Sequence, residues 1–191
     1  MKDIIERYHN DFAGLINSIE VGHKKQKNID FYQGVEAACK MVKRQSSRGG
    51  KIFFIGNGGS AAIASHMAID FWKNGFMHSM SFNDGALLTC LSNDFGYENV
   101  FSKPIKFFAR KEDLLFAISS SGKSKNILNA VKAMRSRGSK VITLSGFRRN
   151  NPLRRMGICN FYVPSCEYGL VEVTHQYICH IILDVIMRKK K

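Results

Sequence analysis

The sequence predicts an α/β protein with a doubly wound, five-stranded parallel sheet flanked by helices. Short apolar segments alternate along the chain with longer segments whose apolar residues recur at helical spacing, and such alternation is typical of a parallel sheet. Several of the short segments contain no polar residue, as expected for strands that are buried on both faces. A chain of 191 residues is long enough for one such domain and short for two.

An N-terminal helical segment is expected before the sheet. Apolar residues recur at helical spacing over 4–16 and again over 31–42, with a polar break at 23–28. Gly49 and Gly50 then end the second helix, because glycine tolerates the left-handed conformation that is common at helix ends.

Five strands and the helices that connect them are expected in the rest of the chain. The predicted strands are 51–55, 80–82, 114–118, 141–144 and 160–163. The predicted helices are 60–71, a turn entering a helix at 83–90, 101–108, 124–137 and the long final helix 171–187. The whole chain, 1–191, is predicted to be a single domain, with helices over 1–47 and the α/β core over 48–191.

The composition is that of a globular protein, with 45% apolar and 23% charged residues. No run approaches the roughly 18 apolar residues of a membrane span, and the start of the chain has acids where a signal peptide would be apolar. There are five cysteines and no CxxC pair. Four of them, Cys39, Cys90, Cys159 and Cys179, have apolar neighbours, which predicts reduced thiols in a core and a cytoplasmic protein.

A net charge of +14 would suit a nucleic-acid binder or a protein that attracts small anions. The basic residues are spread along the chain, however, with local clusters only at 148–149, 154–155 and 188–191. None of these clusters is interleaved with aromatic residues as in nucleic-acid motifs. Nucleic acid is therefore not expected as the main ligand, and a solvated basic surface is the simplest account of the charge.

Two loops follow predicted strands at the edge where open α/β sheets bind ligands. In Gly56-Asn57-Gly58-Gly59-Ser60 the glycines permit a tight turn, and the following helix offers free N–H groups to an anion. In Ser119-Ser120-Ser121-Gly122-Lys123-Ser124, four hydroxyls at a helix start form a phosphate cradle. Neither loop matches GxxxxGK[ST] or GxGxxG, so nucleoside triphosphates and dinucleotides are disfavoured.

Two predicted helices carry groups suited to acid–base chemistry. His66 and Asp70 are four residues apart and so lie on one face of their helix. Glu172 and His180 share a face of the last helix, whereas His175 is rotated away from them.

Four ordered motifs resemble those of the phosphoheptose isomerases, a branch of the SIS (sugar isomerase) fold. The motifs are GNGGSAAIASHMAIDF, LSNDFGYENVF, AISSSGKSKNIL and EVTHQYICHIILDVI, and the match extends from Gly50 to Ile186. The resemblance implies a five-stranded parallel sheet and a cytoplasmic homotetramer, for which residues 1–47 would supply oligomerisation helices. It also implies an enzyme of heptose synthesis for lipopolysaccharide or capsule, with a phosphorylated sugar as its substrate. The composition and the charge distribution, for their part, predict no membrane partner and disfavour nucleic acid.

The resemblance also implies roles for individual residues. Those of the phosphate and sugar site would be Asn57, Gly58, Ser60, Asp94, Ser119, Ser120, Ser121, Ser124 and Glu172, the four serines holding the phosphate. Asp70 would be the base and His180 the acid of an enediol mechanism. A Zn²⁺ ion would be held by His66, Asp70, Glu172 and His180, since two imidazoles and two carboxylates suit that metal.

Two residues depart from the family pattern. Asp70 is one methylene shorter than the glutamate that the family has there, and Glu172 stands where the family has glutamine, so Glu172 is an alternative base. The leading hypothesis is an isomerase that converts sedoheptulose 7-phosphate to D-glycero-D-manno-heptose 7-phosphate. The alternatives are a non-catalytic SIS-domain regulator that binds the bacterial replication initiator, and an isomerase of another sugar phosphate.

Overall fold

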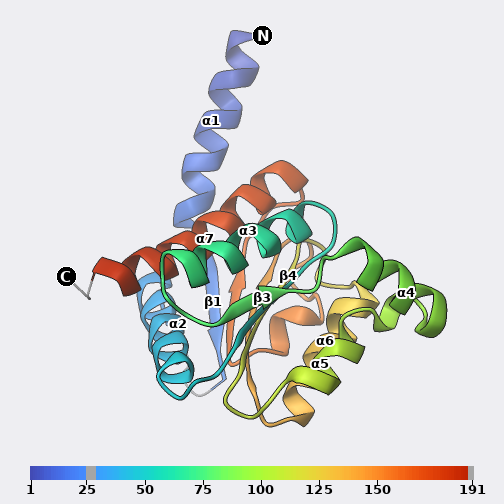
Figure 1. Ribbon diagram of the computed structural model, residues 1–191. Coiled ribbons are helices and arrows are strands. Elements are labelled where there is room, and N and C mark those ends of the chain that lie inside the picture. The colour runs from blue at the N-terminus through green and yellow to red at the C-terminus, as the bar shows by residue number, and fades with distance from the viewer. Residues whose placement is uncertain (25–28, 189–191) are drawn as a thin grey trace.

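The computed structural model describes residues 1–24 and 29–188. Parts of the predicted polar break at 23–28 and of the basic cluster at 188–191 therefore lie outside the described residues. The helices in chain order are α1 (Lys2–Asn17), α2 (Phe31–Ser46), α3 (Gly59–Lys73), α4 (Gly85–Phe95), α5 (Ser102–Phe108), α6 (Lys125–Ser136) and α7 (Tyr168–Arg188) (Figure 1). Two short 3₁₀ turns, η1 (Tyr97–Asn99) and η2 (Leu153–Arg155), complete the helical elements of the described chain.

The sheet confirms the five predicted parallel strands and adds a sixth. The strands are β1 (Glu20–His23), β2 (Ile52–Ile55), β3 (Ser79–Ser81), β4 (Leu114–Ser119), β5 (Lys140–Ser145) and β6 (Cys159–Tyr162). Within the described residues their order is β1-β6-β5-β4-β2-β3, and every neighbouring pair is parallel except β1 and β6.

The edge strand β1 corrects the prediction that residues 1–47 are helical throughout and that the sheet has five strands. Its sequence is only Glu-Val-Gly-His, and all four residues are half-buried, so it lacks the apolar run that marked the central strands. It is held in the sheet by its pairing with β6, in which Gly22 lies opposite Asn160, 138 residues away in the sequence. No local pattern encodes such a pairing.

Helices cover both faces of the sheet, as the doubly wound class requires. Because side chains alternate across a strand, Phe54 and Phe116 face α3 and pack with Phe71, with ring centroids 4.7 to 5.7 Å apart. Phe53 points to the other face and stacks on Phe82 at 5.4 Å. In Figure 1, α2, α3 and α7 lie on one side of the sheet, and α4, α5 and α6 on the other.

Helix α1 extends away from the rest of the molecule (Figure 1). Leu15 is its one buried residue, whereas Ile4 and Ile5 are 72% and 63% exposed. A helix of this kind leaves apolar side chains exposed to solvent in the described part of the chain.

Helix α7 is long and apolar enough to cross a membrane by length and composition alone. Its apolar residues nevertheless include a set that is buried inside the protein, among them Ile178, Ile182 and Leu183, and the helix packs against α2 and α3. Its composition is therefore explained by its position in the core.

Three of the four cysteines expected in a core are buried, namely Cys39, Cys159 and Cys179. Burial raises the pKa of the Cys159 and Cys179 thiols to about 12, so both remain protonated and unreactive. The prediction for Cys90 was wrong. It lies on α4, which has no buried residue, and its apolar neighbours belong to a helix on the outside of the molecule.

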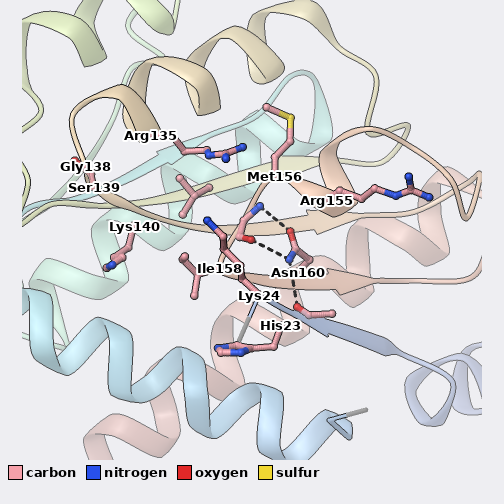
Figure 2. A pocket seen from close by; sticks show the side chains of 13 residues that line it. His23, Lys24, Arg135, Gly138, Ser139, Lys140, Arg155, Met156, Ile158 and Asn160 are labelled. Carbon is pink, nitrogen blue, oxygen red and sulfur yellow. Dashed lines mark hydrogen bonds between the residues drawn. The ribbon is translucent and has the colours of Figure 1, made fainter. Parts of the chain in front are cut away.

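Both edges of the sheet carry a cavity. The carboxyl edge carries the two predicted loops. At the amino edge, where β5 and β6 begin, a second cavity is lined by several basic residues (Figure 2).

Candidate functional site

The two predicted loops form one pocket at the carboxyl edge of the sheet. Strands β2 and β4 are hydrogen-bonded neighbours, with Ile55 opposite Ala117, so the loops that follow them lie side by side. The pocket has a volume of about 340 Å³, within the range of small-molecule sites. It is lined by Asn57, Gly58, Gly59, Ser60, Ser119, Ser120, Ser121, Ser124, Tyr168 and Glu172, and is called the serine pocket below.

The serine pocket contains a buried hydroxyl group without a partner. The Ser119 and Ser121 hydroxyls accept hydrogen bonds from the backbone N–H groups of Gly122 and Lys123, at 3.2 and 3.3 Å. The Ser120 hydroxyl, in contrast, is buried and makes no hydrogen bond with the described residues. A buried hydroxyl without a partner destabilises a protein unless a ligand or water satisfies it, so this group is suited to a ligand rich in acceptors.

The conformation of the serine loop depends on Gly122. This residue has a φ of 62°, and an added Cβ would lie 2.1 Å from the Oδ1 atom of Asn151. Asn151 is buried and donates to the Ser145 hydroxyl and to two backbone carbonyls, which ties the end of β5 to the loop beyond it. Only glycine fits between this amide and the serine hydroxyls.

The side chain of Asn57 is held by its neighbours. Asn57 and Asn126 donate to each other through their side-chain amides at 3.0 and 2.8 Å, and the Tyr97 hydroxyl donates to the Asn57 Oδ1 atom at 3.1 Å. Asn126 is itself only 2% exposed. The pairing leaves one Asn57 amide hydrogen free to donate to a ligand.

Glu172 lies against the glycine loop. A Cβ added at Gly59 would meet the Glu172 carboxylate at 2.2 Å, so the absence of a side chain there admits the carboxylate to the N-terminus of α3. Free N–H groups at a helix start stabilise such a negative charge. Glu172 thus contributes a carboxylate directly to the serine pocket.

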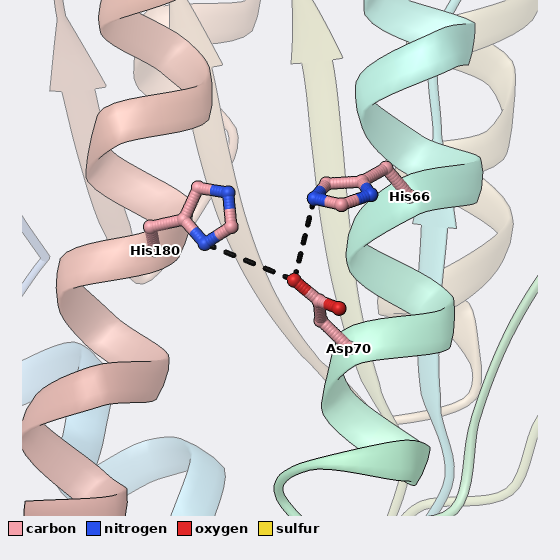
Figure 3. Close-up of side chains that lie close together, drawn as sticks. All are labelled: His66, Asp70 and His180. Atoms are coloured by element: carbon pink, nitrogen blue, oxygen red, sulfur yellow. Dashed lines mark ion pairs between the residues drawn. The ribbon is translucent and has the colours of Figure 1, made fainter.

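Three of the four predicted metal-binding residues form a separate cluster between α3 and α7 (Figure 3). The Asp70 Oδ2 atom lies 3.3 Å from His66 Nε2 and 3.9 Å from His180 Nδ1. The side chain of Asp70 is 18% exposed and those of His66 and His180 are 49% and 36% exposed, so solvent reaches the cluster. One ligand atom from each residue lies within 4.8 Å of the others.

Glu172 was expected both at the sugar-phosphate site and among the zinc ligands. It lines the serine pocket and is not part of the cluster of His66, Asp70 and His180. Asp94 is exposed on α4, where its carboxylate accepts from the Asn93 side chain, and it does not line the serine pocket. The segment that follows α4 instead contacts a pocket residue through Tyr97, three residues further on, whose hydroxyl donates to Asn57.

The structure also adds residues that the sequence did not single out. Tyr168 forms part of the pocket wall and packs edge-on against Phe147 at 4.8 Å. Phe147 has a φ of 57°, a conformation that is uncommon outside glycine. Asn126 and Tyr97 act on the site through Asn57. Both lie within the motifs that resemble the family, but neither was singled out as a site residue.

His175 is fully buried beneath the site, as expected for a residue on the opposite face of α7 from His180. Neither of its ring nitrogens has a hydrogen-bond partner of good geometry among the described residues. Burial lowers the pKa of the imidazole from 6.5 to about 4, with the backbone of Ser145 opposing that shift. His175 is therefore neutral in the folded protein at pH 7.

This buried imidazole makes stability depend on pH. Because its pKa is lower in the folded than in the unfolded chain, the unfolded chain binds more protons between pH 6.5 and 4. The neutral ring contributes fully to the free energy of unfolding above pH 6.5, and this contribution is lost as the pH falls. The free energy of unfolding should therefore decrease by about 2 kcal/mol between pH 7.5 and 5. Urea unfolding of a His175→Leu variant at the two pH values should lack this loss. A His9→Gln variant, changed at an exposed histidine, should retain it, and an equal pH dependence in all three proteins would contradict the assignment.

Known proteins match the chain in sequence and in structure. A family model described as the SIS domain matches residues 30–146. The phosphoheptose isomerase of Vibrio vulnificus (strain CMCP6) is 35% identical over 162 residues, which cover 81% of this chain and 84% of that protein.

Two solved structures share the fold over nearly the whole chain. Phosphoheptose isomerase GmhA from Neisseria gonorrhoeae has a TM-score of 0.81 and 30% identity, and the match covers 96% of this chain and 98% of that one. A phosphoheptose isomerase from Francisella tularensis has a TM-score of 0.83 and 25% identity, with 97% of each chain covered.

Proposed function

Because the chain belongs to the SIS-domain family and, within it, to the phosphoheptose isomerases, we propose that it converts sedoheptulose 7-phosphate to D-glycero-D-manno-heptose 7-phosphate. The observation that carries the proposal is the unpartnered Ser120 hydroxyl inside a pocket of serines at the start of α6. Hydroxyl and backbone N–H donors at a helix start bind phosphate without a basic side chain. The serine pocket would hold the phosphate, and Asn57, Ser60 and Glu172 would contact the sugar.

The isomerisation moves two protons and needs no other reactant. We assign Asp70 as the base that removes a proton from C1 of the ketose, while His180 protonates the carbonyl oxygen on C2 to give an enediol. Return of a proton to C2 and loss of the proton from the oxygen on C1 then produce the aldose. The contact between Asp70 and His180, at 3.9 Å, supports this pairing because the two groups must act on adjacent atoms.

The cluster of His66, Asp70 and His180 also has the composition of a zinc site. Two imidazole nitrogens and one carboxylate oxygen within 4.8 Å match the three protein ligands of many catalytic zinc sites. We propose that these three residues are the zinc ligands in this chain, without Glu172. A bound Zn²⁺ would polarise the carbonyl group of the substrate. A carboxylate bound to a cation is a weaker base, so Glu172 remains the alternative base.

We propose a cytoplasmic homotetramer in which α1 packs against another copy of the chain. Ile4 and Ile5 lie on this projecting helix and are 72% and 63% exposed. Burial of such apolar surface is the main driving force for association. Light scattering on the purified chain tests the assembly, and a monomeric mass of 21.6 kDa would contradict it.

The function is tested with sedoheptulose 7-phosphate as the substrate, in protein with and without added zinc. We expect conversion to the aldoheptose phosphate, and a Ser120→Ala variant should raise KM about tenfold with less effect on kcat, since one contact to a charged phosphate is lost. Ser136→Ala, changed on the exposed end of α6, should leave both constants unchanged. Absence of the aldose product under both metal conditions would exclude the proposed reaction.

A further inference from the structure

The cavity at the amino edge of the sheet lies at the far end of β5 from the serine pocket. It has a volume of about 490 Å³ and is lined by residues at the end of β1, the C-terminus of α6 and the starts of β5 and β6. Lys140 begins β5 at this cavity, whereas Ser145 ends the same strand opposite Ser119. The cavity is therefore separate from the proposed active site.

Four basic side chains surround this cavity, namely Lys24, Arg135, Lys140 and Arg155. Figure 2 shows Lys140 and Arg155 on opposite sides of the view, with Arg135 above and Lys24 between them. No aspartate or glutamate is among its described lining residues. In the described part of the chain, none of the four side chains makes an ion pair or a hydrogen bond.

Other basic residues of the protein, in contrast, have acidic partners. Arg154 pairs with Glu20 at 2.6 Å and lies over the ring of Tyr162, while the adjacent Arg155 is among the residues that line the cavity. Arg149 shares the same carboxylate, and Lys51 pairs with the buried Asp113. Arg135 has partial compensation because it lies in the last turn of α6, where the helix dipole is negative. The other three charges have no such compensation.

The floor of the cavity is held in place by Asn160. Its Oδ1 atom accepts from Thr143 Oγ1 and from the Gly157 N–H, both at 2.8 Å. Its amide donates to the carbonyls of Gly22 and Gly157 at 3.2 Å, which joins β1, β5 and the turn before β6. A floor fixed in this way is formed before a ligand arrives, which lowers the entropic cost of binding.

We propose that this cavity is a binding site for a small anion that carries two or more phosphate groups. Four positive charges without an ion-pair partner among the described residues match several phosphates better than a single one, and gathering like charges without an anion is unfavourable. The volume is that of a small-molecule site, and the half-buried Met156 and Ile158 supply apolar surface for an organic part of the ligand. A recessed cavity favours such a molecule over the extended backbone of a nucleic acid.

The experiment measures binding of inorganic tripolyphosphate to the full chain by isothermal titration calorimetry. A Lys140→Gln/Arg155→Gln variant should weaken binding about a hundredfold, because each charged contact is worth roughly a factor of ten. The matched control is Lys106→Gln/Lys132→Gln, which removes two lysines from the neighbouring groove between α5 and α6 and should change the affinity less than twofold. Arg135→Gln provides a third, single-site variant of the cavity.

Three results would overturn the proposal. If Ser120→Ala abolishes tripolyphosphate binding, the anion occupies the serine pocket instead. If both double variants weaken binding equally, the attraction comes from the diffuse positive charge of the surface. If a twelve-nucleotide single strand binds more tightly than tripolyphosphate and through Lys140 and Arg155, the surface binds nucleic acid. Unchanged isomerase activity in the cavity variants would show that they fold and that the two sites are separate.

Discussion

Replacement of Asp70 by asparagine is expected to lower kcat about a thousandfold while KM changes less than about threefold. Asparagine keeps the size of the side chain but has no basic oxygen, so the proton on C1 of the ketose loses its acceptor. The phosphate contacts lie in the serine pocket, which Asp70 does not line, so binding should persist. Steady-state kinetics with sedoheptulose 7-phosphate measure both constants.

A Glu172→Gln variant separates the two candidate bases. It should retain most of kcat if Asp70 is the base, and it restores the residue that relatives are expected to have at this position. A thousandfold loss in Glu172→Gln together with a small loss in Asp70→Asn would reverse the assignment. Asp184→Asn is the matched control, since Asp184 is exposed on α7 and makes no hydrogen bond or ion pair with the described residues.

Most of the fold was predictable because its central strands are buried on both faces. Strands such as Leu114–Ser119 must be continuously apolar to lie between two helical layers, and that requirement is visible in a single segment of sequence. The edge strand β1 carries no such requirement. It is determined by its register with β6, far away in the chain, and so the segment that contains it was predicted as helix.

For the candidate site, the sequence predicted which loops and helix residues lie close together, but not how α7 distributes its side chains between them. Loops that follow adjacent strands must meet, so placing Ser119–Ser124 beside Asn57 required only the order of the sheet. Residues four apart on a helix predicted the pairing of His66 and Asp70. Spacing within α7 did not reveal that Glu172 lies at the serine pocket while His180 reaches Asp70. That division depends on how α7 crosses α3, which is set by packing of the whole core.

Replacement of Gly122 by alanine is expected to destabilise the protein by about 3 kcal/mol and to raise KM at least tenfold. A φ of 62° costs a residue with a Cβ roughly 1 kcal/mol. The remaining loss, about 2 kcal/mol, comes from the new methyl group, which would lie 2.1 Å from Asn151 Oδ1. That oxygen accepts from the Arg154 N–H, and the same side chain donates to the Ser145 hydroxyl, so its movement breaks buried hydrogen bonds.

Gly138→Ala distinguishes this steric effect from backbone strain alone. Gly138 has a φ of 75°, but a Cβ there would meet nothing closer than Lys111 Cγ at 3.6 Å. This variant should lose only about 1 kcal/mol in urea unfolding and should keep its KM. If Gly122→Ala and Gly138→Ala destabilise the protein equally and leave KM unchanged, then Asn151 can move aside without displacing the serine hydroxyls. The larger effect at Gly122 is expected because Gly122 packs directly against the Asn151 side chain and belongs to the same loop as Ser120. A shift of Asn151 would therefore move the loop that carries the Ser120 hydroxyl.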